Sequence, residues 1–261
     1  TPAAVPYFPF GSLTIGVRRG VGGALVYDVF GKRFPLTDRR VMVLEDHRLP
    51  QITFTIIIPG AGGYFDPPDK IGLASYTASL MREGTKTRTS PQISEALETM
   101  AASLIVSSSF SGTTASIGGN SLSENFDKLM DLTADVLLNP LFDAAEWDRF
   151  KTRTKAQLIQ QRTNPNFLAS ETFNRVVFGS HPASRVSPTA ANLDAITPDA
   201  LVAFHRTHYV PDHAAVAFAG DISLAEARKL VEAKLGSWKK LGAPKAGVTE
   251  PPPLGSPKVT L

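Results

Sequence analysis

The stretch that most constrains the fold is SENFDKLMDLTADVLLNP, residues 123–140. Its mostly apolar positions recur at i, i+3, i+4, i+7, i+10 and i+11, namely Phe126, Leu129, Met130, Thr133, Val136 and Leu137. This spacing predicts an amphipathic helix with one apolar stripe. We expect Ser123 to cap the helix and Pro140 to end it. Because such a stripe must be buried, the chain has to supply a second layer that covers it.

Five β-rich runs can form that layer: 39–46, 51–59, 103–111, 113–121 and 213–221. The third and fourth runs meet at Ser111 and Gly112, which predicts a hairpin. Further helices are expected near 70–84, 90–102, 143–163, 167–178, 196–209 and 223–238. Asp69, Thr197 and Ser223 are the expected caps of three of them. The order of elements predicts an α+β fold, with helices packed on one face of a mostly antiparallel sheet.

The chain divides into three parts by composition. We expect residues 1–35 to form an extended N-terminal segment and residues 36–241 to form the α+β domain. Residues 242–261 contain five prolines, three of them consecutive, which predicts an extended linker. The final KVTL resembles the start of a strand, so the linker is expected to lead to a second domain that this chain lacks.

Composition excludes several kinds of site and partner. The chain has 261 residues, a net charge of +3 and no cysteine. Disulfides, thiolate zinc sites and cysteine nucleophiles are therefore excluded. No basic run interleaved with aromatic residues indicates a nucleic-acid partner, and no apolar run approaches the length of a membrane span. The start, TPAAVPYFPFG, fits either the remainder after signal-peptide removal or a sequence cut at that point; the first interpretation predicts a periplasmic or other extracytoplasmic location.

Four segments, in order, resemble one protein family. They are VMVLEDHRLPQITFTIIIPGAG, DPPDKIGLASYTASLMREGT, DVLLNPLFDAAEWDRFK and FHRTHYVPDHAAVAFAGDI. From about Lys32 to Lys240 the chain is similar to the N-terminal half of the pitrilysin/insulinase-type (M16) zinc metallopeptidases, which include mitochondrial processing peptidase. The resemblance implies the family's half-clam α+β domain and a second homologous domain beyond the linker. It also implies an edge strand that pairs with extended peptide substrate; 103–111 or 113–121 is the expected strand.

The resemblance also locates a metal site that this chain lacks. Active members carry H-x-x-E-H on the first helix, where two His bind zinc and the Glu activates a zinc-bound water. Ser75 and Ser79 match the two His positions, and Ala78 matches the Glu. A further Glu ligand of the family falls near Ala156 or Gln157. All four groups are missing, so the resemblance implies a member that is not catalytic by itself and holds no zinc or other cofactor.

This pattern implies a non-catalytic subunit or half of an M16-type peptidase. Such a chain would bind extended peptide and complete the chamber of a zinc-bearing homologous partner. Two alternatives stay open. One is a structural or peptide-binding module of a larger complex, and the other is a peptidase whose metal site lies in a missing C-terminal half.

A second candidate metal site is the histidine-rich stretch HRTHYVPDH, which offers His205, His208 and His213. The structural interpretation is favoured. His205 and His208 lie at i, i+3 near a helix end, where a positive charge complements the helix dipole. His213 is expected to open a strand after a Pro-Asp turn.

Overall fold

The computed structural model describes residues 15–19, 25–29, 32–35, 41–242 and 247–250, and the side chains of the last two ranges. The chain divides into two compact units, Thr1–Arg40 and Val41–Leu261. In the first unit, three short strands form an antiparallel sheet in the order β1-β2-β3. They are β1 (Ile15–Arg19), β2 (Leu25–Val29) and β3 (Lys32–Pro35). The sequence analysis did not predict these strands.

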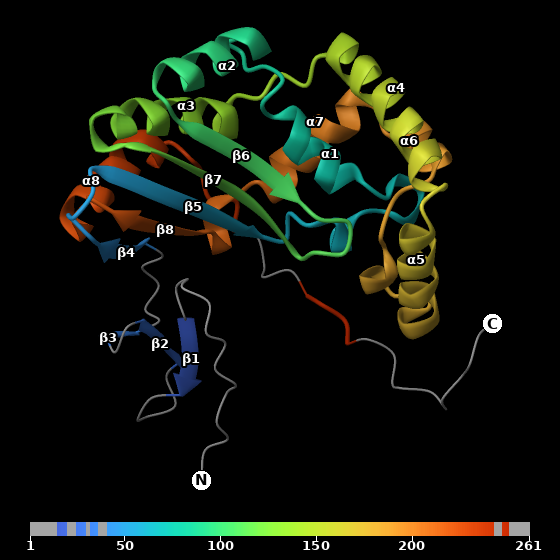
Figure 1. Ribbon diagram of the computed structural model, residues 1–261, viewed down its shortest axis with the longest axis horizontal. Coiled ribbons are helices and arrows are strands. Elements are labelled where there is room, and N and C mark those ends of the chain that lie inside the picture. The colour runs from blue at the N-terminus through green and yellow to red at the C-terminus, as the bar shows by residue number, and fades with distance from the viewer. Residues whose placement is uncertain (1–14, 20–24, 30–31, 36–40, 243–246, 251–261) are drawn as a thin grey trace. The chain divides into compact units, whose positions relative to one another are not determined.

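The second unit is built on a five-stranded mixed sheet in the order β4-β8-β5-β7-β6 (Figure 1). Its strands are β4 (Val41–Glu45), β5 (Gln51–Pro59), β6 (Ser103–Ser108), β7 (Thr114–Leu122) and β8 (Ala215–Gly220). Three of the four pairings are antiparallel, and β4 pairs with β8 in parallel. The mostly antiparallel sheet is therefore confirmed.

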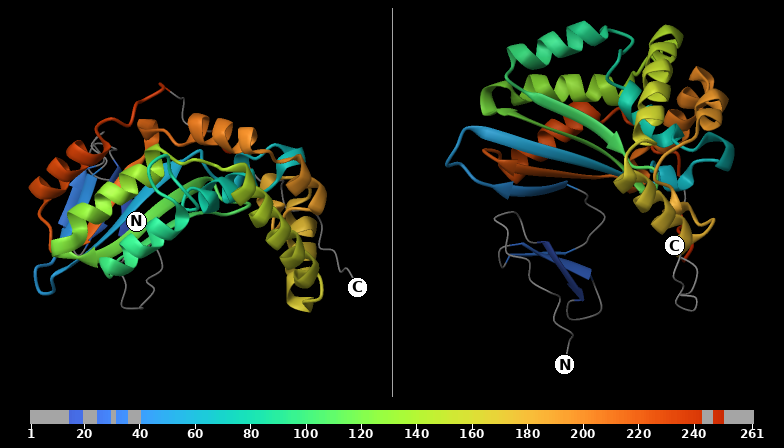
Figure 2. Two further views of the ribbon diagram at one scale, coloured as in Figure 1. Left: turned by 90° about the horizontal axis from the view of Figure 1, so that it is seen from above. Right: turned by 45° about the vertical axis from the view of Figure 1, so that its right-hand side comes forward.

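Eight α-helices accompany the sheet in the described part of the chain. They are α1 (Leu73–Leu80), α2 (Ser90–Thr99), α3 (Phe126–Leu138), α4 (Ala144–Gln161), α5 (Pro165–Phe178), α6 (Ala190–Ala195), α7 (Pro198–His208) and α8 (Leu224–Leu235). Five short 3-10 turns join them: η1 (Gly63–Phe65), η2 (Pro68–Lys70), η3 (Ser123–Asn125), η4 (Pro182–Ser184) and η5 (Pro211–His213). Figure 2 shows the helical layer over one face of the sheet, which confirms the α+β architecture.

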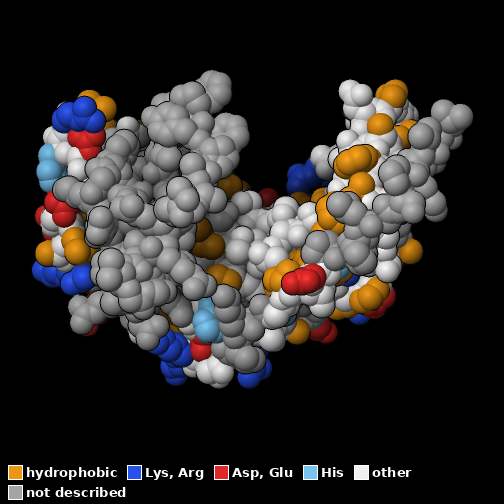
Figure 3. All heavy atoms as spheres, turned by 90° about the horizontal axis from the view of Figure 1, so that it is seen from below, with side chains coloured by type: hydrophobic (Ala, Val, Ile, Leu, Met, Phe, Trp, Pro, Cys, Tyr) orange, Lys and Arg blue, Asp and Glu red, His pale blue; other side chains and the backbone are white. Residues whose placement is uncertain are grey.

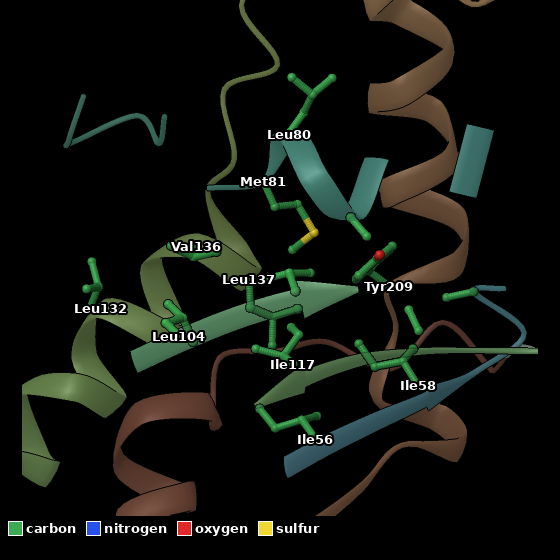
Figure 4. Close-up of a cluster of buried hydrophobic side chains, with 14 of the residues drawn as sticks. Ile56, Ile58, Leu80, Met81, Leu104, Ile117, Leu132, Val136, Leu137 and Tyr209 are labelled. Atoms are coloured by element: carbon green, nitrogen blue, oxygen red, sulfur yellow. The ribbon is translucent and has the colours of Figure 1, made fainter. Parts of the chain in front are cut away.

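The core lies between that layer and the covered sheet face. Alternate residues of β5 are buried, from Ile52 to Ile58, while Gln51, Thr53 and Ile57 are exposed on the opposite face. This alternation is the period-2 signature of a strand with one buried side. The stripe of α3 fills the core from above, where Phe126 packs edge-on against Phe54 at 5.9 Å between ring centroids. Figure 4 shows the side chains of α1, α3 and the strands meeting in this cluster.

Two residues that were expected to cap helices do not cap them. Asp69 lies in η2 and pairs with Lys70, while α1 begins at Leu73. Ser123 does not cap α3, because its hydroxyl donates to the carboxylate of Asp221, 98 residues away, at 2.8 Å. The expected caps Thr197 and Ser223 do accept backbone N–H bonds at the starts of α7 and α8.

Two details of the strand predictions also change. The turn between β6 and β7 is longer than a tight hairpin at Ser111 and Gly112, because β6 ends at Ser108 and β7 begins at Thr114. β7 is not an edge strand, because it pairs with β5 on one side and β6 on the other. Among the strands that the structure describes, β6 pairs only with β7 and forms one edge of the sheet, while β4 forms the other.

Candidate functional site

Helix α1 carries the positions that match the zinc motif, and a buried carboxylate begins it. Asp66 accepts hydrogen bonds from the backbone N–H groups of Gly72 at 2.7 Å and Ala74 at 2.9 Å. Gly72 has φ 102°, and a Cβ there would lie 2.6 Å from the ring of Tyr76, so glycine is required. The chain can therefore turn sharply into α1 with its first amides paired.

Asp66 is also an unusual carboxyl group. It is 3% exposed, and burial raises its pKa to about 6, although the two amide hydrogen bonds oppose the shift. The positive charge of Arg185 opposes it too. The Arg185 guanidinium itself donates from Nη1 to the backbone oxygens of Gly63 at 2.7 Å and Tyr64 at 3.2 Å. The loop before α1 is thus held by groups that are distant in sequence.

The motif positions on α1 form a face of small side chains. Ala78 is fully buried, whereas Ser75 and Ser79 are half-buried. The Ser79 hydroxyl donates to the backbone oxygen of Ser75 at 3.0 Å, which is the usual local bond of a serine within a helix. Neutral hydroxyls are poor zinc ligands and a methyl group cannot accept a proton. This helix therefore has a regular backbone and no group for metal-assisted hydrolysis at these positions.

Helix α4 carries the position where the resemblance places the fourth ligand. Gln157 and its neighbour Ala156 are both exposed, and neither is a carboxylate. Helices α1 and α4 are joined by aromatic packing, with Tyr76 lying 5.4 Å from Phe150 and 6.1 Å from Trp147 between ring centroids. Across residues 41–242 and 247–250, no three His, Cys, Asp or Glu side chains are grouped so as to hold a metal ion.

The histidines of α7 are bound to backbone carbonyls. His205 donates from Nε2 to the oxygen of Leu137 at 2.8 Å, and His208 donates from Nδ1 to the oxygen of Gly60 at 2.7 Å. Burial lowers the pKa of both side chains, although each hydrogen bond opposes that shift. These two nitrogens are therefore unavailable to a metal, which leaves only Nδ1 of His205 and Nε2 of His208 as candidate ligand atoms in these two rings. His213 lies in η5 rather than at the start of β8.

A polar network that the sequence analysis did not identify holds the loop after α1. Asp135 on α3 accepts hydrogen bonds from Thr85 at 2.7 Å, Thr87 at 2.7 Å and Arg88 at 2.6 Å. Burial alone would raise the pKa of Asp135, but these bonds together lower it. No local pattern indicates this network, because Asp135 does not belong to the apolar stripe of α3, although it is buried in the structure.

The edge strand β6 lies beside α1. Leu104 and Val106 face the core, whereas Ile105 is 60% exposed on the other face. An edge strand presents unpaired backbone N–H and C=O groups at alternate residues. Beside the helix with the motif positions there is therefore a backbone template for a further strand.

Comparison with known proteins agrees with this architecture. The family model described as "Insulinase (Peptidase family M16)" matches residues 40–185, more than half of the chain. The model "Peptidase M16 inactive domain" matches residues 195–261. Among solved structures, the peptidase M16 inactive domain from Pseudomonas fluorescens superposes with a TM-score of 0.75 at 24% identity, covering 92% of this chain and 54% of that one. Pitrilysin superposes with a TM-score of 0.70 at 18% identity, covering 92% of this chain and 26% of that one.

The curated relatives are uncharacterized zinc proteases. The one from Rickettsia bellii is 24% identical over 195 residues, which are 73% of this chain and 47% of the relative. YmxG from Bacillus subtilis is 22% identical over 232 residues, which are 88% of this chain and 55% of YmxG. The chain thus spans about half the length of the curated relatives it matches. From the family match and the shared fold, the chain belongs to peptidase family M16.

Proposed function

We propose that this chain is a non-catalytic subunit or half of an M16-type peptidase. It binds extended peptide and completes the chamber of a zinc-bearing homologous partner. The observation that carries the proposal is the condition of α1 and α4: the helices are intact, yet Ser75, Ala78, Ser79 and Gln157 stand where the resemblance places the ligands and the base. Retaining the scaffold without its metal chemistry fits a role in binding rather than hydrolysis.

The edge of β6 supports the peptide-binding part of the proposal. An extended peptide that adds to a sheet edge gains main-chain hydrogen bonds, and alternate side chains then select the sequence. β6 is an edge in the described sheet and lies against α1, so a peptide paired with it would pass the motif positions. Substrate would be held there and cut by groups that the partner supplies.

Helix α5 supports the partner part of the proposal. None of its 14 residues is buried, yet its side chains include Phe173 at 65% and Val176 at 52% exposure. Figure 3 shows hydrophobic side chains gathered along α5, at the right of the view. An isolated amphipathic helix of this length is marginal in water, and exposed apolar patches are typical of interaction surfaces. A homologous domain that covers α5 would account for these side chains.

The test is reconstitution with a cognate homologue that carries H-x-x-E-H. We expect the mixture to cleave an extended peptide at least several-fold faster than the homologue alone. Ile105→Asp on β6 should reduce this gain, because a charge on an edge strand disfavours strand addition. Ile159→Asp on α4 is the matched control, since Ile159 is also exposed, at 73%, and lies outside the sheet.

Failure of the cognate partner to accelerate cleavage would contradict the companion role. If Ile105→Asp and Ile159→Asp change the acceleration equally, the companion role still holds, but β6 is not the site that binds the peptide.

A further inference from the structure

The segment after α8 returns to the loop that begins α1. Residues 247–250, in red in Figure 1, lie in the same compact unit as that loop. The backbone N–H of Thr249 donates to the hydroxyl oxygen of Tyr64 at 2.9 Å. The hydroxyl groups of Thr249 and Tyr64 share a second hydrogen bond of 2.6 Å. One short segment is thereby held to a residue 185 positions earlier.

His181 completes the contact from a third segment. Its Nδ1 accepts from the backbone N–H of Ala183 at 3.2 Å, so in the neutral ring the proton is on Nε2. Nε2 lies 3.1 Å from Thr249 Oγ1 and 3.2 Å from the Thr249 backbone oxygen, and donates there. The rings of Tyr64 and His181 pack edge-on, with 5.6 Å between centroids. Every polar atom of Thr249 therefore has a partner in the pair Tyr64 and His181.

The residue that receives Thr249 is rigidly placed. Tyr64 is 8% exposed and lies in η1, where its ring also packs against Phe65 at 5.1 Å. Its backbone oxygen accepts from Arg185, just beyond η4. Two residues later, Asp66 pairs the first amides of α1. Tyr64, which binds Thr249, and Asp66, which pairs the first amides of α1, thus lie only two residues apart.

From these contacts we infer that Tyr64, His181 and Thr249 form a clasp that locks residues 247–250 to the domain and couples their position to the start of α1. When the clasp is closed, the segment is fixed at η1 and η4. When it opens, η1 loses a partner, and the cap that Asp66 provides for α1 loosens. This inference is independent of the proposed companion role, because it concerns contacts within this chain alone.

Backbone hydrogen exchange in the purified protein tests the clasp at the Thr249 amide. Tyr64→Phe keeps the ring and removes the hydroxyl, so we expect that amide to exchange roughly three- to tenfold faster. Tyr209→Phe is the matched control, because the buried Tyr209 hydroxyl has no hydrogen-bond partner among the described residues. That control should leave the Thr249 amide unchanged. A Thr249 amide that exchanges at the rate of an unstructured peptide in the parent protein would overturn the clasp.

The coupling has its own readout at the Gly72 and Ala74 amides. Thr249→Val keeps the size of the side chain and removes the hydroxyl bonds to Tyr64 and His181, so it weakens the clasp without touching η1, while the Thr249 amide still donates to Tyr64. We expect both amides, which donate to Asp66, to exchange measurably faster in Thr249→Val and in Tyr64→Phe, but not in Tyr209→Phe. If Tyr64→Phe releases the Thr249 amide and both clasp variants leave the Gly72 and Ala74 amides unchanged, the coupling to α1 is wrong.

Discussion

At the scale of single residues, the start of α1 is held by specific contacts, and small side chains occupy the positions that the resemblance matches to the zinc motif. Asp66 and Gly72 shape the start of α1, and Tyr76 packs α1 against α4. The reactive positions are filled by small side chains that the helix tolerates, and Ser79 satisfies its hydroxyl locally. The proposal that this chain is non-catalytic rests on the side chains at these positions, which offer neither a metal ligand nor a base.

The raised pKa of Asp66 predicts a specific pH dependence. Because the pKa is about 6 in the folded protein and 3.8 ordinarily, the folded state binds this proton more tightly. Its stabilising effect is complete below about pH 4 and is lost as the pH rises through 6. Asp66→Asn removes the titration, so the free energy of unfolding of the variant minus that of the parent should rise by on the order of 2–3 kcal/mol from pH 4 to pH 7.

Chemical denaturation at several pH values measures this difference. Asp69→Asn is the control, because Asp69 is an exposed carboxyl whose pKa is lowered by its hydrogen bond to Lys70. Its difference from the parent should be small and should run in the opposite direction. Parallel pH profiles for Asp66→Asn and the parent would show that Asp66 titrates normally.

The histidines of α7 should behave as structural groups. His205→Ala leaves the backbone oxygen of Leu137 without its partner and opens space beside Phe142. We expect a loss of about 1–3 kcal/mol in the free energy of unfolding. Zinc content, measured on the same sample, should not change. A fall in bound zinc without loss of stability would instead identify His205 as a metal ligand.

At the scale of elements, local periodicity and local caps are what the sequence reveals. The stripe of α3 and the caps Thr197 and Ser223 were predictable because each involves residues within a few positions of one another. The features that were placed wrongly depend on contacts that no local pattern of caps or periodicity encodes. The Ser123 hydroxyl donates to Asp221, and Asp66 accepts from the amide of Gly72, which lies beyond η2 at the start of α1.

The site shows the same division. The resemblance to the family placed the motif positions on α1, and helix geometry then puts residues at i, i+3 and i+4 on one face. Which strand forms the edge depends on whether β5 pairs with β7, and no local pattern encodes that pairing. The bonds of Asp135 to the loop after α1 are equally invisible, since they join residues about 50 positions apart.

Asp135 supplies a prediction at this scale, because it ties the loop between α1 and α2 to α3. Asp135→Ala leaves Thr85, which is 4% exposed, and the partly exposed Arg88 without their acceptor. We expect a loss of about 2–3 kcal/mol in the free energy of unfolding. Asp131→Ala is the control on the same helix, since Asp131 is 54% exposed and its partner Lys234 also pairs with Asp127. That control should cost less than about 1 kcal/mol, and equal losses would show that the network adds nothing beyond a surface ion pair.

At the scale of the whole molecule, the described unit is an α+β domain of the M16 fold with an edge strand and an exposed apolar helix. Among the described residues, one side of β6 is unpaired, and the apolar side chains of α5 are exposed. None of the helices in that part of the chain combines the length and hydrophobicity that a bilayer crossing requires. The proposed companion role would explain both features, since peptide would pair with the edge of β6 and a partner domain would cover α5.

The measurement that tests the central claim most directly is the zinc content of the purified chain. The protein is stripped with a chelator, reloaded with excess zinc, separated from free metal and measured by elemental analysis. Because the motif positions hold serine, alanine and glutamine, we expect a molar ratio of zinc to protein near zero. A ratio near one would contradict it, and would mean that this chain carries a metal centre of its own.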